Sequence, residues 1–267
     1  MHALTILPLL GLSALAAAVD PPVATILGYH EVDPSGAHQH TTIPRRSASA
    51  GTRDEQLRYT VFRENFVQQL DYLEANGYTV IPLSLLVGHL RGTVAALPPR
   101  AVVLTVDDGW SCTYSEVLPE LRRRGMPFTV FVYPKFVGRG SHAMTWQQIE
   151  ELACEGVEVE SHSYTHPLLT RRHHPETAAY DEFLRHELLG SRAAIERATA
   201  RPVRYFCYPF GDHDEEVAEA AAKYGYEAAV TTERGAITRS TPLMRLNRYL
   251  IHNDTTLDEF RRFLLQN

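Results

Sequence analysis

Two carboxylates and two imidazoles in this 267-residue chain follow short segments that read as β-strands, at spacings that suit a hydrolytic metal site. Asp107 and Asp108 precede Gly109 and come directly after the run Ala101 to Val106. Adjacent carboxylates repel each other, and a bound cation would relieve this by taking one as a ligand and leaving the other as a base. For this motif alone, an ordinary Asp-Asp-Gly turn explains the pattern equally well.

The imidazoles belong to His162 and His166, which follow the run Val157 to Ser161. Side chains at this spacing share one face of a helical turn, so both rings can reach one ion together with Asp108. The ligand set favours zinc, and nickel, cobalt or iron would also be accepted. Three protein ligands leave a position for water, and Asp107 is then the expected base that takes its proton.

Two more apolar runs end at groups that amide hydrolysis could use. The run Val203 to Tyr208 leads into Pro209-Phe210-Gly211, where the backbone N–H of Phe210 could face an oxyanion. The run Val23 to Tyr29 ends at His30, which could protonate a leaving amine. A purely structural histidine remains an equally good explanation of His30.

The elements that must position these groups alternate along the chain. Strands are expected at 23–29, 79–81, 101–106, 128–132, 157–161, 203–208, 228–231 and 245–251, and helices at 62–75, 84–91, 114–124, 146–155, 176–200, 214–224 and 257–265. This alternation predicts an α/β fold with a parallel sheet, and the number of units favours a closed barrel over an open doubly wound sheet. In such barrels the active site lies where the strands end, which is where the motifs stand.

The composition is that of one globular domain, with 44% hydrophobic and 22% charged residues. A formal net charge of −6 and the lack of a Lys or Arg block argue against nucleic acid as a partner. A neutral polymer fits this balance at least as well as a charged one. Nothing in the pattern predicts an oligomeric state.

Residues 1–18 have an apolar stretch that ends in three alanines, which predicts a secretory signal peptide followed by one domain over 19–267. We therefore expect export to the periplasm or the cell exterior. An N-terminal core helix is the alternative. The stretch is shorter than the roughly 20 residues of a membrane span, and no later segment is more apolar, so we expect no stable membrane insertion.

With these motifs the sequence resembles the polysaccharide deacetylase family, carbohydrate esterases with a nodulation-type domain. The family's Thr-Phe-Asp-Asp-Gly motif is similar to Thr105 to Gly109, and its His-Ser-x-x-His motif to His162 to His166. The resemblance implies a single domain that forms a distorted (β/α) barrel of about seven parallel strands. It implies Asp107 as the base, Asp108 and the two histidines as ligands of one divalent metal ion, and an oxyanion-binding amide at Phe210.

The sequence departs from the family's third motif at Cys207, where the resemblance implies an Arg that orients the base. Arg248, on the last expected strand, is the candidate replacement, and a surface or structural Arg is the alternative. The missing Arg also motivates a different class of function, a non-catalytic carbohydrate-binding module. A glycosidase fits poorly, because two adjacent Asp residues cannot flank a scissile bond.

The N-terminal segment Gly28 to Val32 resembles the subgroup that deacetylates poly-β-1,6-N-acetylglucosamine in biofilm matrix. This implies His30 as the acid, with His252 in a Leu-x-His sequence as the competitor. Chitin, peptidoglycan and acetylated xylan stay open as substrates.

Four residues near the motifs carry further expectations. Trp110, Tyr164 and Pro209 are expected to contact the sugar, although packing in the core is the alternative for the aromatic rings. Glu160 stands two residues before His162, on the same face of the expected strand. We therefore expect it in the barrel interior, hydrogen-bonded close to the metal ligands.

Overall fold

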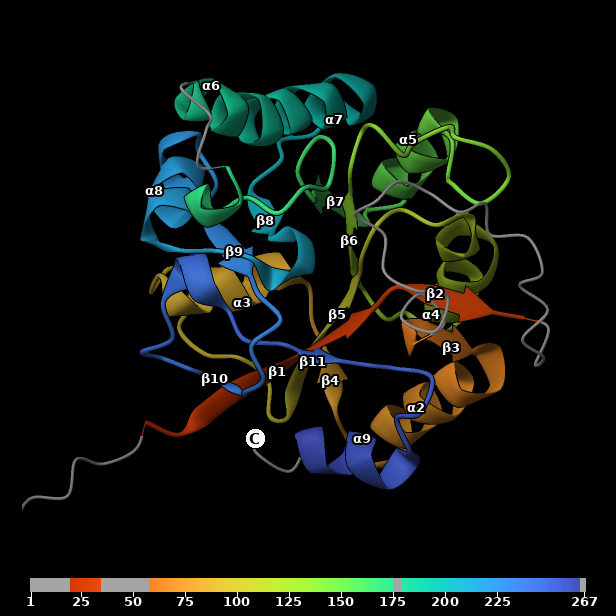
Figure 1. Cartoon of the computed structure of the whole chain (residues 1–267). Helices are drawn as coiled ribbons and strands as arrows, with labels where there is room; N and C mark the ends of the chain where they lie inside the picture. Colours follow the sequence, from red (N-terminus) through yellow and green to blue (C-terminus); the bar gives the residue numbers. More distant parts are fainter. Residues whose placement is uncertain (1–19, 35–57, 175–178, 265–267) are drawn as a thin grey trace, which may run out of the picture.

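A curled parallel sheet forms the centre of the protein (Figure 1). The computed structural model describes residues 20–34, 58–174 and 179–264, so the expected signal peptide lies outside the described residues. The sheet has nine strands, and within it only the pairing of β1 with β10 is antiparallel among the described pairings. Its parallel strands are β1 (Pro22–Tyr29), β4 (Thr79–Val80), β5 (Ala101–Val106), β6 (Thr129–Val132), β7 (Glu158–Ser161), β8 (Tyr205–Cys207), β9 (Ala228–Val230) and β11 (Tyr249–Leu250).

The segment around β11 joins the two ends of this sheet. Leu246 pairs with Val230 of β9, and β11 pairs with β1. The parallel sheet therefore curls into a distorted barrel, as the alternation of elements predicted. The barrel is irregular at β5, which pairs with β4 at its start and with β6 at its end.

Helices surround the curled sheet (Figure 1). They are α2 (Arg63–Ala75), α3 (Leu83–Leu90), α4 (Leu118–Arg124), α5 (Trp146–Cys154), α6 (Tyr180–Arg185), α7 (Ser191–Thr199), α8 (Glu215–Lys223) and α9 (Leu257–Leu264). Instead of the single regular helix expected over 176–200, a π-helical turn, His186–Gly190, joins α6 to α7. In the described part of the chain, no helix combines the length and apolarity needed to cross a membrane.

Three short strands lie outside the parallel barrel ladder. β2 (Glu31–Asp33) pairs with β3 (Thr60–Phe62), and β10 (Ile237–Thr238) pairs with β1. β3 occupies the start of the helix expected from 62, because the backbone groups there pair with β2 before α2 begins. The expected strand at 245–251 is shorter than predicted, since a 3₁₀ turn, Leu243–Arg245, precedes β11.

Alternate strand residues supply two apolar clusters, which is the period of a β-strand. Ile26, Val103 and Phe131 belong to the cluster in the barrel interior. Their neighbours Leu104 and Val130 belong to the larger cluster between the sheet and the helices. Because both faces of β5 and β6 are buried, these strands read as almost continuous apolar runs and were recognisable in the sequence.

Glu160 is buried as expected, but it does not contact a metal ligand. Its Oε2 accepts hydrogen bonds from the backbone N–H groups of Arg204 and Tyr205, both at 2.7 Å. Burial raises the pKa of this carboxyl, although the two amides oppose the shift. Buried backbone N–H groups need an acceptor, and the carboxylate of Glu160 is the acceptor for the two N–H groups at the start of β8. The expected role of Glu160 beside the metal ligands is therefore wrong.

Candidate active site

Asp107 and Asp108 are adjacent in the chain but face different partners. The ladder between β1 and β5 extends to Asp107, whose N–H donates to Tyr29 O at 2.9 Å, so its side chain continues into the barrel interior. Asp108 has a φ of 75°, which turns its carboxylate away from that of Asp107. Within the described residues, four of the six non-glycine residues with positive φ lie in the motif loops: Asp108, Ser163, His166 and Phe210. Such conformations cost energy and concentrate at functional sites.

Asp108, His162 and His166 bring three donor atoms together. The Nε2 atoms of the two histidines are 3.1 Å apart, and Asp108 Oδ1 lies 3.6 Å from that of His162 and 3.5 Å from that of His166. A tetrahedral ion with ligand distances of about 2.0–2.2 Å needs donors about 3.3–3.6 Å apart. The spacing and the chemistry of these donors therefore fit one divalent ion.

Both histidines are prepared to act as neutral ligands. His162 Nδ1 lies 2.7 Å from the carbonyl oxygen of Cys207, so a proton on Nδ1 leaves the lone pair of Nε2 free. Burial, assisted by the neighbouring His166, lowers the pKa of His162 to about 4. Burial, assisted by His30, lowers that of His166 to about 4 as well. Neutral imidazole is the form that binds metal ions.

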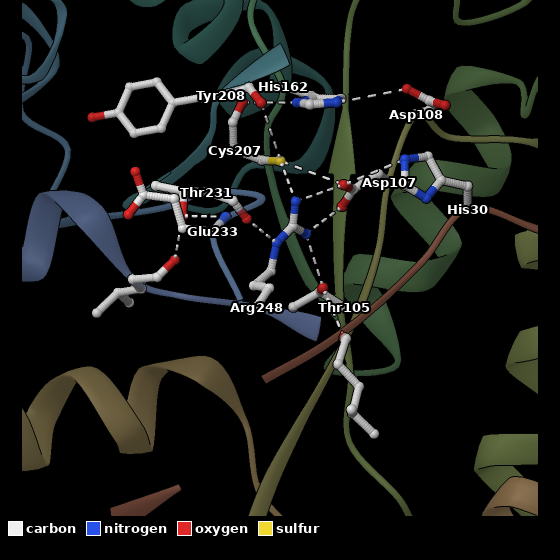
Figure 2. A network of polar contacts seen from close by, with 12 residues as sticks. His30, Thr105, Asp107, Asp108, His162, Cys207, Tyr208, Thr231, Glu233 and Arg248 are labelled. Carbon is white, nitrogen blue, oxygen red and sulfur yellow. Dashed lines mark hydrogen bonds and ion pairs between the residues drawn. The ribbon is translucent and has the colours of Figure 1, made fainter. Parts of the chain in front are cut away.

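Arg248 holds Asp107 in a buried ion pair, which Figure 2 shows at the centre of a polar network. Its two terminal nitrogens donate to Oδ1 and Oδ2 of Asp107, both at 2.9 Å. The same guanidinium donates to Thr105 Oγ1 and to Thr231 O. Burial by itself would raise the pKa of Asp107, but the charge and the hydrogen bonds of the Arg248 guanidinium lower it below the ordinary value. Asp107 is thus ionised and fixed in orientation.

Cys207 faces the same carboxylate from β8. Its Sγ lies 3.4 Å from Asp107 Oδ2 and accepts a hydrogen bond from Arg248 at 3.1 Å. Burial raises the pKa of the thiol well above its usual value, so the protonated thiol donates to Asp107. Asp107, His162 and Cys207 are also close enough to hold an ion. A carboxylate already bound to a guanidinium and a protonated thiol make this second set a poor metal site.

His30 lies closer to the base than its competitor. His30 Nε2 is 3.8 Å from Asp107 Oδ2, and its ring packs on Tyr59 with centroids 4.6 Å apart. His252 also packs on Tyr59, with ring centroids 5.2 Å apart, and makes no ion pair with Asp107 among the described residues. Burial and the charge of Arg58 lower the pKa of His252, which disfavours the protonated imidazole an acid needs.

The Pro209-Phe210-Gly211 turn presents Phe210 beside the metal ligands. The turn is held by Gly211 N–H to Tyr208 O and Asp212 N–H to Pro209 O, and the Phe210 N–H takes no part in these bonds. The ring of Phe210 is 52% exposed and lies 4.6 Å from that of His166. Gly211 has a φ of 70°, and a Cβ there would meet Thr232 Oγ1 at 2.0 Å, so only glycine fits.

The three residues expected to contact the sugar lie next to the motif residues. Trp110 is half-buried and donates from Nε1 to Asp108 Oδ2 at 3.0 Å, which leaves Oδ1 for an ion. Tyr164 is half-buried and packs on His186, with ring centroids 4.5 Å apart, and Pro209 is buried. Their contacts with a sugar stay a prediction. The ring of Phe210 adds a more exposed aromatic surface next to the site. The sequence did not single out this ring, because its exposure depends on the turned backbone.

Glu187 is a functional candidate that the sequence analysis missed. It is buried in the π-helical turn between α6 and α7, and its Oε2 accepts from the N–H groups of Tyr164 and Thr165 at 3.0 and 2.8 Å. Its Oε1 accepts from Thr165 Oγ1 at 2.7 Å. These bonds hold the loop between His162 and His166. The available signal was the position of Glu187 three residues after Leu184, which puts a carboxylate on the buried face of the expected helix.

Comparisons with known proteins agree with this geometry. The sequence profile of the polysaccharide deacetylase family matches residues 95–229. The chain is 30% identical over 188 residues to YxkH of Bacillus subtilis, covering 70% of this chain and 63% of that protein. It is 27% identical over 253 residues to the poly-β-1,6-N-acetyl-D-glucosamine N-deacetylase of Escherichia coli K12, covering 81% of this chain and 37% of that enzyme. The chain thus spans less than two thirds of the length of either relative.

Among solved structures, a polysaccharide deacetylase from Bacillus cereus matches with a TM-score of 0.70 at 25% identity. The match covers 90% of this chain and 68% of that one. The fold of the curled sheet therefore recurs in a solved protein of that name.

Glu187→Ala is expected to weaken metal binding by about ten- to a hundredfold, because the loop between the two histidines loses its carboxylate acceptor. Titration of the metal-free protein with Zn²⁺ in a calorimeter measures this directly. Glu182→Ala is the matched control, since Glu182 on the neighbouring α6 is bonded only to the exposed Arg185. Equal Zn²⁺ affinity of the wild type and a folded Glu187→Ala protein would contradict the role of Glu187.

Proposed function

We propose that this chain, which belongs to the polysaccharide deacetylase family, is a metal-dependent hydrolase that removes acetyl groups from N-acetylglucosamine units of an extracellular polysaccharide. The observation that carries the proposal is the ionised, buried Asp107 beside a three-donor set that fits one divalent ion. Poly-β-1,6-N-acetylglucosamine is the polymer we favour, because the relative from Escherichia coli is named for it.

The protein groups divide the chemistry among them. An ion held by Asp108, His162 and His166 would supply a Lewis acid at the acetyl carbonyl and lower the pKa of the attacking water. Zinc is the default, and nickel, cobalt or iron would suit the same donors. Asp107 accepts the proton of that water, and Arg248 keeps the carboxylate ionised and oriented.

Two further groups complete the hydrolysis. The N–H of Phe210 donates to the oxygen of the acetyl carbonyl as negative charge develops on it. His30, close to Asp107, delivers a proton to the amide nitrogen as the C–N bond breaks. Acetate and a free amine on the sugar are the products.

Substrate contacts beyond the acetyl group belong to the rim of the site. The exposed ring of Phe210 offers an apolar face to a sugar ring next to His166. Chitin, peptidoglycan and acetylated xylan are the alternative polymers. A signal peptide over 1–18, with the domain over 19–267, would deliver the protein to such polymers in the periplasm or outside the cell.

A non-catalytic carbohydrate-binding module is the alternative of another class. It was motivated by the absence of an Arg at position 207. Arg248 supplies a guanidinium to the same carboxylate from a different strand, which weakens that motive. A binding module also has no use for a base beside a metal site.

Zn²⁺-loaded protein is expected to release acetate from β-1,6-linked N-acetylglucosamine oligomers, faster than from chitin oligomers. Chelator-stripped protein should lose the activity and regain it when Zn²⁺ is restored. Mass spectrometry of the sugar product supplies the control, because a deacetylase leaves the chain length unchanged. No acetate from any N-acetylated polymer, with Zn²⁺ bound, would overturn the proposal in favour of the binding module.

Arg248→Met is expected to lower kcat by about ten- to a hundredfold, because Asp107 loses its bidentate partner. Adding Cys207→Arg in that background should restore part of the lost kcat, since a guanidinium on β8 can reach the same carboxylate. Steady-state kinetics and thermal unfolding of both variants separate this effect from misfolding. A folded Arg248→Met protein with unchanged kcat would remove the orienting role.

His30→Ala is expected to lower kcat by about 10²-fold or more, as for the loss of a general acid. His252→Ala is the matched control and should change kcat only slightly, because His30 Nε2 lies 3.8 Å from Asp107 Oδ2 whereas His252 makes no such pair with Asp107 among the described residues. Both variants are assayed with metal content measured in parallel. The reverse ranking would assign the acid to His252.

A further inference from the structure

The imidazole of His30 has no hydrogen bond among the described residues, although the proposed mechanism needs this ring in one place. Its Nε2 lies 3.8 Å from Asp107 Oδ2, which is an ion-pair distance and too long for a hydrogen bond (Figure 2). Its Nδ1 is buried and lacks a hydrogen-bond partner in the described chain. A working histidine is usually oriented by a hydrogen bond to its second ring nitrogen. The orientation of His30 therefore depends on packing.

The ring of Tyr59 packs on this imidazole. The two ring centroids are 4.6 Å apart, and the planes make an angle of 42°. His252 packs on the same tyrosine, with centroids 5.2 Å apart and an angle of 70°. This second contact restricts how far the ring of Tyr59 can turn away from His30. A ring pair at such a distance favours one orientation by about two- to tenfold.

The backbone fixes Tyr59 on two sides. The parallel ladder of β2 and β3 begins at Glu31, directly after His30, and at the residue directly after Tyr59. Glu31 N–H also donates to Tyr59 O at 3.3 Å. From the segment after β11, Asn253 N–H donates to Arg58 O at 2.9 Å. Tyr59 is thus tied both to the strand that follows His30 and to the segment that carries His252.

We propose that Tyr59 is a positioning residue for the acid: its ring, in place of a hydrogen bond, keeps His30 beside Asp107 in the orientation from which a proton reaches the amide nitrogen. The inference rests on the proposed function, because it takes His30 as the acid. Within the described chain, Tyr59 belongs neither to the metal donor set nor to the hydrogen bonds around Asp107. Loss of the ring should therefore slow proton transfer and leave metal binding unchanged.

Tyr59→Leu in the Zn²⁺-loaded full chain should lower kcat for acetate release from β-1,6-linked N-acetylglucosamine oligomers by about two- to tenfold, with KM and Zn²⁺ affinity unchanged. Tyr59→Phe keeps the ring and should restore the kcat of the wild type. Tyr59→Met is measured in parallel, because its flexible side chain fills the space of the ring if leucine destabilises the fold. Tyr72→Leu is the matched control and should leave kcat unchanged, since this half-buried tyrosine on α2 packs on Tyr78 and Phe260.

A double-mutant cycle separates positioning from a direct sugar contact. In the His30→Ala background, Tyr59→Leu should cause no further loss of kcat, because the ring acts only through the imidazole. A further loss of the same size would show that Tyr59 acts on its own and would overturn the proposal. Equal losses for Tyr59→Phe and Tyr59→Leu, or an unchanged kcat in the folded Leu and Met variants, would do the same. Failure of both variants to fold would make Tyr59 a core residue and likewise exclude the role.

Crystal structures of the Zn²⁺-loaded Tyr59→Leu and Tyr59→Phe proteins test the positioning without turnover. The imidazole of His30 should leave its place beside Asp107 in the first variant and keep it in the second. If it does so while the wild type releases no acetate, the positioning role stands and the proposed function fails. If acetate is released and His30 keeps its place in both variants, the positioning role is overturned and the function stands.

Discussion

The buried ion pair between Asp107 and Arg248 is the interaction on which the site depends. Removing two charges from water costs several kcal/mol per ion, which is offset only by close geometry and further hydrogen bonds. Both conditions hold, because the guanidinium also binds Thr105 on β5 and the backbone after β9. Arg248 itself stands just before β11, in the segment that joins the two ends of the sheet. The segment that closes the barrel therefore also carries the side chain that orients the base.

Two other buried carboxylates, those of Glu187 and Asp212, hold the loops at the barrel mouth by accepting hydrogen bonds from them. Glu187 accepts from two amides inside the histidine loop, and Asp212 accepts from the N–H and hydroxyl of Thr170 further along it. Asp212 also follows the turn that presents Phe210, so the loops after β7 and β8 are tied to each other. Positive φ angles at His166 and Phe210 are sustained by such contacts. The positions of the donor atoms on the histidine loop thus depend on two buried carboxylates, those of Glu187 and Asp212, which are not themselves in the donor set.

The sequence predicted the strands and the motif positions because both depend on local patterns. The sequence alone shows where an apolar run occurs and which polar residues follow it, so strands buried on both faces and the motifs at their ends can be predicted without the tertiary structure. The prediction that Glu160 bonds near the metal ligands was wrong, because strand alternation gives the face on which a side chain lies but not its partner. Its carboxylate instead accepts hydrogen bonds from the backbone at the start of β8. The packing of Tyr164 on His186 was likewise not readable from the sequence, since Ser163 before it has positive φ.

The position of the base-orienting guanidinium shows how barrel geometry can substitute for a motif residue. Cys207 on β8 and Arg248 before β11 both reach Asp107, although they lie on different strands of the curled sheet. Room for Arg248 comes from small neighbours: a Cβ on Gly28 would lie 3.4 Å from its Nη1, and position 207 carries only a thiol. A large side chain at either position would compete for the space that the guanidinium fills. The space beside Asp107 holds one guanidinium. Because Arg248 of the closing segment fills it, the motif carries the small Cys207 in place of an Arg.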